Sequence, residues 1–256
     1  MKFLAQKFLA RAAAAVLAMG FALEAQAAEI RVLCIPAMRA SFEQLLPQFE
    51  RDSGDKVVVN YQIYPGQKAR IESGDFDIAL FARPQIDELN KQGKTVAATT
   101  ADIARTSIGV AVKAGAPKPD ISSEDAFKRT LMAAKSITYT KESQTGVYLT
   151  KRLETLGVAD AIKGKLILQP GGAMTTPAVA RGEAELAIVL VSDIVSTPGV
   201  DLVGPLPASL QNYVTQTAAV GVSAKQPASA AALIKYLSTP AAVAVFKAKG
   251  FEPPAR

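Results

Sequence analysis

Short apolar runs alternate with stretches of helical periodicity along most of the chain. Phe42, Leu45, Leu46 and Phe49 recur at i, i+3, i+4 and i+7, the spacing that places side chains on one face of a helix. The short apolar runs between such stretches indicate buried strands. We expect strands at Ile30–Ile35, Lys56–Tyr61, Asp77–Phe81, Ser107–Val112, Ser136–Thr140, Leu166–Leu168 and Leu186–Val191. We expect helices near Arg39–Arg51, Gln67–Ser73, Pro84–Gln92, Ser123–Ala133, Gly146–Leu156, Thr175–Ala180, Pro227–Leu237 and Ala241–Lys249.

This alternation predicts an α/β fold in which largely parallel sheets are covered by helices. Two local signals support the last helix. Thr239 before Pro240 is typical of an N-cap followed by proline at the first helical position. Gly250 suits the left-handed residue that often follows a helix.

The N-terminal residues have the pattern of a secretory signal peptide. The first eleven positions hold three basic residues and no acid, an uncharged run follows from Ala12 to Leu23, and Ala25-Gln26-Ala27 has the form of a cleavage site. The uncharged run is shorter than the roughly 20 residues that span a bilayer. We therefore expect cleavage after Ala27 and a periplasmic mature chain without a membrane anchor; the alternative is a buried N-terminal helix.

Charge and composition narrow the ligand class. The net charge of +6 falls to +4 without the leader, and the cations are spread along the chain. This balance suits a small anionic ligand and does not favour nucleic acid. Histidine is absent and Cys34 is the only cysteine, so we expect no disulfide, no metal site and no cofactor. Cys34 lies in an apolar run and is expected to be buried in the core.

Four strand-to-helix junctions carry glycine or small residues and no acid at their inner positions. In open α/β sheets, ligands bind beyond the carboxyl ends of the strands, where helix N-termini offer free N–H groups and a positive dipole end. Each junction alone is also typical of an ordinary loop, but together they indicate an anion site. The junctions are Pro36-Ala37-Met38-Arg39, Tyr64-Pro65-Gly66-Gln67, Ser143-Gln144-Thr145-Gly146 and Gly171-Gly172-Ala173-Met174.

Two arginines follow predicted strands. Arg39 occupies the first turn of a helix, where the dipole disfavours a cation, so a bound carboxylate would explain its position. The alternative is a solvated arginine at the helix edge. Arg83 is a second candidate, although an ion pair with Asp87 is the favoured interpretation of that residue.

Several segments together resemble the type II periplasmic solute-binding proteins, and among them the molybdate-binding proteins of ABC importers. The segments are IRVLCIPAMRASFEQLLPQFERDSGDKVVVNY, RIESGDFDIALFAR, TGVYLTKRLETLGVADAIKGKLI, VARGEAELAIVLVSDI and the ending GFEPP. The resemblance implies two lobes, each a mixed, mostly parallel sheet flanked by helices, with two crossing hinge strands at Ser107–Val112 and Tyr213–Val222. It assigns residues 28–107 plus 219–256 to lobe 1 and 108–218 to lobe 2. It also implies a monomer whose partner is an ABC importer permease.

The chain departs from the molybdate-binding pattern at three positions. Ala37 stands where those proteins usually have serine, Tyr64-Pro65-Gly66-Gln67 replaces a stretch that carries a second serine, and Leu190-Val191-Ser192-Asp193 lacks the usual tyrosine. A tetrahedral oxyanion needs donors on every side, so we expect a larger planar anion, such as a di- or tricarboxylate, rather than molybdate. The residues expected to line the ligand site are Ala37, Met38, Arg39, Tyr64, Gly66, Gln67, Arg83, Ser143, Thr145, Gly146, Gly172, Ala173 and Ser192.

Two functions stay open at this point, and binding of molybdate or another oxyanion is a less favoured third. One is a receptor that delivers an organic acid such as aconitate or tricarballylate to an importer. The other is a cofactor-free aconitate isomerase, because proteins resembling this group include enzymes that interconvert cis- and trans-aconitate by moving a proton. Its candidate proton-transfer residues are Tyr148, Tyr64, Glu142 and Lys141, for which simple packing or solvent exposure is the alternative.

Overall fold

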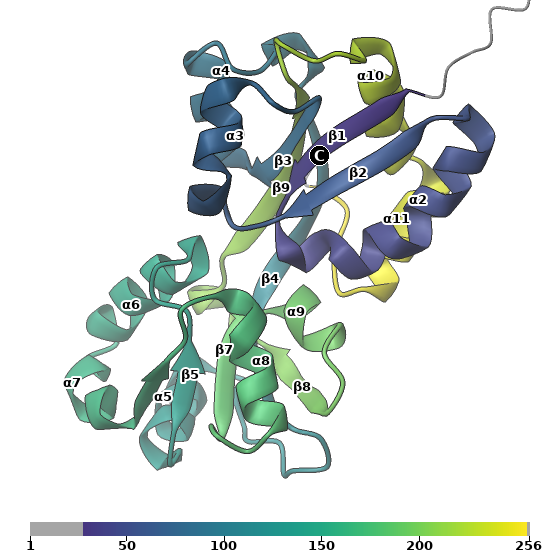
Figure 1. Ribbon diagram of the computed structural model, residues 1–256. Helices are drawn as coiled ribbons and strands as arrows, with labels where there is room; N and C mark the ends of the chain where they lie inside the picture. Colours follow the sequence, from purple (N-terminus) through teal and green to yellow (C-terminus); the bar gives the residue numbers. More distant parts are fainter. Residues whose placement is uncertain (1–27, 255–256) are drawn as a thin grey trace, which may run out of the picture.

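The computed structural model describes residues 28–254, apart from the side-chain surroundings of Gly172 and Ala173. The expected signal peptide, residues 1–27, lies outside these residues. The chain forms two α/β lobes, one above the other in Figure 1, with strands β4 and β9 at the crossing between them. Within the described residues no single helix is long and apolar enough to cross a membrane. The bent pair α10 and α11 reaches that length and apolar composition only when its two helices are counted together.

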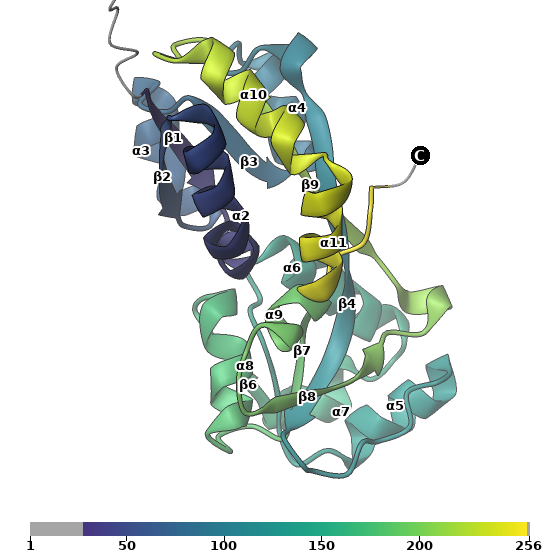
Figure 2. The same cartoon turned by 90° about the vertical axis from the view of Figure 1, so that its right-hand side faces the viewer.

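The first lobe contains a sheet in the order β2-β1-β3-β9-β4. Strand β1 is parallel to β2 and β3, and β9 returns antiparallel to β3 and β4. Helices α2, α10 and α11 cover one face, as Figure 2 shows, and α3 and α4 cover the other. The bounds are β1 (Glu29–Cys34), α2 (Arg39–Ser53), β2 (Lys56–Tyr61), α3 (Lys68–Ser73), β3 (Ile78–Ala82), α4 (Arg83–Lys91), β4 (Ala101–Lys113), β9 (Tyr213–Val220), α10 (Pro227–Leu237) and α11 (Pro240–Ala248).

The second lobe continues from β4, which pairs with β7 on one side and β8 on the other. Strand β5 lies parallel to β7 and β6, so this sheet also has a parallel part. Helices α5, α6 and α7 bury one face, and α8 and α9 bury the other. The bounds are α5 (Glu124–Ala133), β5 (Ile137–Tyr139), α6 (Gln144–Thr155), α7 (Ala159–Ile162), β6 (Leu166–Leu168), α8 (Gly172–Ala180), β7 (Leu186–Leu190), α9 (Val191–Val195) and β8 (Val200–Pro205).

The register of β4 brings the carboxyl ends of both sets of parallel strands face to face. Gln216 of β9 pairs with Ala82, the last residue of β3, and with Ala104 of β4. Leu190, the last residue of β7, pairs with Ile108 four residues further along β4. At about 3.4 Å per residue, the two strand edges are about 14 Å apart along β4. Ligands of α/β sheets bind at such edges.

Most expected elements are present, and three differ in a way that matters. Strand β4 begins at Ala101 rather than Ser107, since the charges of Asp102 and Arg105 are matched by Arg83 and Glu252. Helix α8 begins at Gly172 rather than Thr175, so the fourth junction forms its first turn.

Strand β8 was not expected. It is only half-buried and pairs with β4 alone, so its sequence VDLVGP lacks the apolar run of an inner strand.

The C-terminal helix signals are confirmed. The Thr239 hydroxyl accepts a hydrogen bond from the Ala242 amide at 3.3 Å, and Pro240 is the first residue of α11. Gly250 has a φ of 78°, in the left-handed region. Cys34 is fully buried as expected, and burial raises the pKa of its thiol.

Candidate ligand site between the lobes

The first junction presents an arginine without a carboxylate partner. Residues Pro36–Met38 form a 3-10 turn, η1, and α2 follows without a capping side chain or an acid in its first turn. The Arg39 guanidinium stacks on the ring of Tyr61 at 4.1 Å, and its side chain is exposed. It forms no ion pair with any carboxylate of residues 28–254. The cation is therefore held in place by an aromatic face and is available to an anion.

The second junction buries a glutamine whose orientation is fixed. Residues Tyr64–Gln67 form the turn η2 after β2. Gln67 is fully buried, and its Nε2 donates to the main-chain oxygen and to the Oδ1 of Asn60, both at 2.9 Å. Its Oε1 has no partner. Tyr64 packs edge-on against Phe81 at 5.2 Å, and burial raises the pKa of the Tyr64 hydroxyl.

The third junction is a capped helix start that requires glycine. The Ser143 hydroxyl accepts from the Gly146 amide at 3.0 Å and donates to the Thr140 carbonyl at 2.8 Å. A Cβ on Gly146 would lie 1.9 Å from that same carbonyl oxygen. The Ser143 hydroxyl is thus committed to the helix cap, whereas the neighbouring Lys141 and Glu142 side chains are exposed.

The fourth junction is connected to the third by a hydrogen bond between two threonine hydroxyls. Gly172 and Ala173 form the first turn of α8, which has no capping side chain and no acid. The hydroxyl of Thr175 in the same helix lies 3.1 Å from the hydroxyl of Thr140, which precedes the third junction. Thr145 of the third junction is buried.

Besides the four junctions, Ser192 of the second lobe contacts the hinge strand β4. Ser192 lies in the first turn of α9 after β7, and its amide donates to Thr106 Oγ1 of β4 at 3.3 Å. The Thr106 hydroxyl in turn donates to the Gly250 carbonyl at 3.3 Å. Beside Ser192, burial raises the pKa of the Asp193 carboxyl to about 7.

Buried polar atoms without partners collect at these facing edges. Among residues 28–254 such side-chain atoms occur on Ser41, Gln67, Ser192 and Gln216. Ser41 lies in the first turn of α2, and Gln216 lies opposite the last residue of β3. A buried polar group left without a hydrogen bond costs about 1–3 kcal/mol, so native proteins contain few of them. Their concentration at one place indicates a surface that is completed by a polar ligand.

Other candidates from the sequence have protein partners. Arg83 contacts the carboxylates of Asp87 and Asp102, each at 3.0 Å, so the favoured interpretation of an ion pair with Asp87 is confirmed. The Tyr148 hydroxyl donates to the Leu210 carbonyl at 3.1 Å and accepts from Arg152 Nε at 2.9 Å.

Sequence reasoning missed Ser41 and Gln216. Ser41 lies in the first turn of α2 and Gln216 lies between two threonines of β9, so the neighbouring residues mark neither as buried. Only the folded structure shows that both side chains are buried near the lobe edges.

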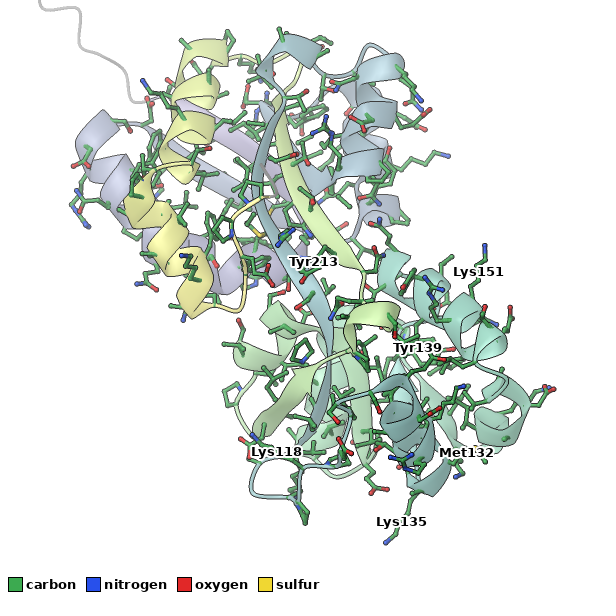
Figure 3. The ribbon with its side chains drawn as sticks, turned by 180° about the vertical axis from the view of Figure 1, so that it is seen from behind. Lys118, Met132, Lys135, Tyr139, Lys151 and Tyr213 are labelled. Carbon is green, nitrogen blue, oxygen red and sulfur yellow. The ribbon has the colours of Figure 1, made fainter. Side chains whose placement is uncertain are left out.

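A basic cavity lies at the opposite end of the second lobe. Its volume is about 720 Å³, and its lining includes residues that precede β5 and begin β7, away from the carboxyl edge. Figure 3 shows Lys118 and Lys135 at this far end and Tyr213 at the crossing between the lobes. The charged side chains of the lining are Lys113, Lys118, Arg129, Lys135 and Glu185. Among the described residues no group of three or more His, Cys, Asp or Glu side chains is placed to hold a metal ion.

The fold and the facing edges define a two-lobed binding protein. The family model of bacterial extracellular solute-binding proteins matches residues 30–252, and the chain belongs to this family. The chain is similar to solved structures of a substrate-binding domain of a putative molybdenum ABC transporter from Clostridium difficile (TM-score 0.73, 19% identity, 90% of this chain and 100% of that chain). It is also similar to the periplasmic molybdate-binding protein of Azotobacter vinelandii (TM-score 0.74, 21% identity, 88% and 100%).

Two curated relatives carry different activities. An aconitate isomerase of a Pseudomonas species is 32% identical over 236 residues, which are 88% of this chain and 87% of that protein. The molybdate-binding protein of Azotobacter vinelandii is 30% identical over 234 residues, 89% of this chain and 91% of that protein. The expected membership of the type II periplasmic binding proteins is therefore confirmed.

Proposed function

We propose that this protein binds a small organic polycarboxylate between its two lobes, in the periplasm, and presents it to an ABC importer. The observation that supports this proposal is the pairing of an available cation, Arg39, with buried neutral donors at facing strand edges. The helices that follow the four junctions have no acid in their first turns, so no fixed carboxylate opposes the anion there.

The first junction disfavours a tetrahedral oxyanion as the ligand. Ala37 offers no hydroxyl where molybdate-binding proteins usually have one. A carbon frame with two or three carboxylates can reach Arg39 and the second lobe together.

A second candidate function is an aconitate isomerase on the same scaffold. It is supported by the 32% identity with the Pseudomonas enzyme over most of both chains. Proton transfer along an allylic frame needs a base and an acid beside the anion site. Lys141 and Glu142 adjoin the third junction and are exposed, and Tyr64 belongs to the second. Tyr148 is less suited, because its hydroxyl is held by Leu210 and Arg152.

Thermal unfolding with a panel of anions tests the binding proposal. The mature chain is mixed with citrate, tricarballylate, cis- and trans-aconitate, molybdate and sulfate. A ligand at about 100 times its dissociation constant adds roughly 2.7 kcal/mol to the free energy of unfolding. We expect this shift with a tricarboxylate. Stabilisation by molybdate alone would overturn the proposal. So would carboxylate binding that persists in Arg39→Ala but is lost in Lys113→Ala, because the anion would then occupy the basic cavity.

The same samples distinguish the receptor from the enzyme. Incubation of cis-aconitate with catalytic amounts of protein is followed by NMR. Formation of trans-aconitate at many turnovers per protein would establish the isomerase. Binding without conversion supports the receptor.

A further inference from the structure

Gln216 is a hinge residue whose buried side-chain amide has no hydrogen-bond partner in the fold. It lies in β9 at the edge of the first lobe, opposite Ala82 and Ala104. Its side chain is fully buried, and neither Oε1 nor Nε2 has a hydrogen-bond partner. A buried amide has one acceptor and two donor hydrogens to satisfy, and here both functions are left without a partner.

The neighbours of Gln216 place it on the face of the hinge where the two lobes meet. In the regular antiparallel pair of β4 and β9, Ala104 lies opposite Gln216 and Thr106 opposite Val214. Alternation along a strand therefore puts the side chains of Gln216, Ala104 and Thr106 on one face. Ala104 packs in the core beneath α2, the helix that carries Ser41. Thr106 holds the Ser192 amide of the second lobe.

The unpaired atoms of this region include hydrogen-bond acceptors that an ionised carboxylate does not satisfy. Gln67 cannot present its amide the other way round, because its Nε2 faces the Asn60 main-chain carbonyl at 2.9 Å and a flipped amide would oppose two oxygens. Its buried Oε1 therefore requires a donor. Gln216 has a second buried Oε1, and in contrast to Gln67 its Nε2 is also unpaired, so a single ligand hydroxyl is assigned to Gln216. Ionised carboxylates, sulfate and molybdate bring acceptors only, whereas a hydroxyl group brings a donor.

We propose that the ligand is a polycarboxylate that also carries a hydroxyl group, and that Gln216 is the residue that recognises this hydroxyl. The hydroxyl donates to Gln216 Oε1, and Gln216 Nε2 donates to a neighbouring carboxylate oxygen of the same molecule. Arg39 neutralises a second carboxylate. This inference rests on the proposed binding of a polycarboxylate between the lobes and specifies the substrate class.

Citrate and tricarballylate test the inference, because they share one tricarboxylate frame and differ by a single hydroxyl. Affinities of both are measured by calorimetry at pH 7.5 for the mature chain, for Gln216→Met and for Gln48→Met, a control at an exposed glutamine of α2. We expect the unmodified chain to bind citrate at least tenfold more tightly than tricarballylate. Gln216→Met should bring the two affinities to within about twofold, chiefly by weakening citrate. Gln48→Met should leave the preference unchanged.

The outcomes separate this inference from the proposed function. If neither tricarboxylate binds, the proposed function fails and this inference fails with it. If both bind the unmodified chain with equal affinity, or if Gln216→Met keeps the full preference, the hydroxyl inference is overturned while polycarboxylate binding stands. The comparison of the two ligands on the unmodified chain does not depend on the folding of any variant. Gln216→Asn, which keeps the amide but shortens its reach, provides a second variant and should also lose the preference.

Discussion

At the scale of single residues, two arginines with similar positions in the sequence have different surroundings. Arg39 and Arg83 both follow a strand of the first lobe, and both are exposed. Arg83 has two carboxylate partners, Asp87 and Asp102, whereas Arg39 stacks on Tyr61 and has no carboxylate partner among the described residues. Arg83 is therefore a structural cation and Arg39 a candidate ligand contact. The sequence does not show this difference, because a partner such as Asp102 is distant in sequence from Arg83.

Arg39→Ala should therefore weaken carboxylate binding by about 10- to 100-fold, since a hydrogen bond to a charged group contributes about 1.5–3 kcal/mol. Arg83→Ala is the matched control and should leave the affinity within about twofold. Calorimetric titration with citrate measures both. Equal losses in the two variants would mean that only the long-range field of the positive charge matters, and would contradict a direct contact.

The raised pKa of the Asp193 carboxyl should make the stability of the protein depend on pH. Burial raises this pKa to about 7, from an ordinary value of 3.8. Between these values the folded chain keeps a proton that the unfolded chain has released, so the free energy of unfolding falls as the pH rises from about 4 to 7. The fall from this one group is at most about 4 kcal/mol.

Asp193→Asn removes the titration while keeping the shape of the side chain. We expect the variant and the unmodified chain to be about equally stable in urea at pH 3.5, below the ordinary pKa of the carboxyl, and the variant to be more stable at pH 8. Because all other groups titrate alike in both proteins, the difference isolates Asp193. A difference that does not change with pH would show that the carboxyl is ionised in the folded chain.

At the scale of elements, local patterns predicted the strand-to-helix junctions well. The acid-free helix starts and the Thr239 cap depend on neighbouring residues, so the sequence carries them directly. Strand β8 and the first half of β4 depend on distant partners. In the sequence, Asp102 is typical of a loop residue. In the fold, its carboxylate contacts Arg83 and accepts a hydrogen bond from Thr217, which allows it to lie in β4. Gln216 likewise sits between two threonines in an ordinary polar stretch, and only the pairing of β9 with β3 and β4 buries it.

The start of α6 gives a prediction at this scale. Gly146→Ala places a Cβ 1.9 Å from the Thr140 carbonyl oxygen, so the backbone at the third junction must shift. We expect a loss of at least about 3 kcal/mol in the free energy of unfolding, at the upper end for overpacking. Gly164→Ala is the control, because its Cβ meets nothing within 4 Å and should change stability little. Equal effects in urea unfolding would mean that the junction adapts freely.

At the scale of the whole molecule, three segments meet at the crossing between the lobes. Besides β4 and β9, the C-terminal segment pairs with β4: the Arg105 amide donates to the Glu252 carbonyl at 2.9 Å, and the Glu252 amide donates back at 2.7 Å. The Arg105 guanidinium contacts the Glu252 carboxylate at 2.8 Å and stacks on Tyr213, the first residue of β9, at 4.2 Å. One side chain thus links all three segments at the point where the lobes would move relative to each other.

Arg105→Met should loosen this link while keeping the apolar stem of the side chain. The ion pair is partly exposed and contributes little, so we expect a loss of about 1 kcal/mol, mostly from the contact with the Tyr213 ring. Arg70→Met, which breaks the exposed ion pair with Asp75, is the control and should cost less than about 0.5 kcal/mol. Urea unfolding measures both. Arg105 contacts hinge residues and is not expected to contact the ligand. Arg105→Met should therefore keep the preference for citrate over tricarballylate, even where both affinities change. Loss of that preference would mean that ligand selection depends on the hinge as a unit rather than on Gln216.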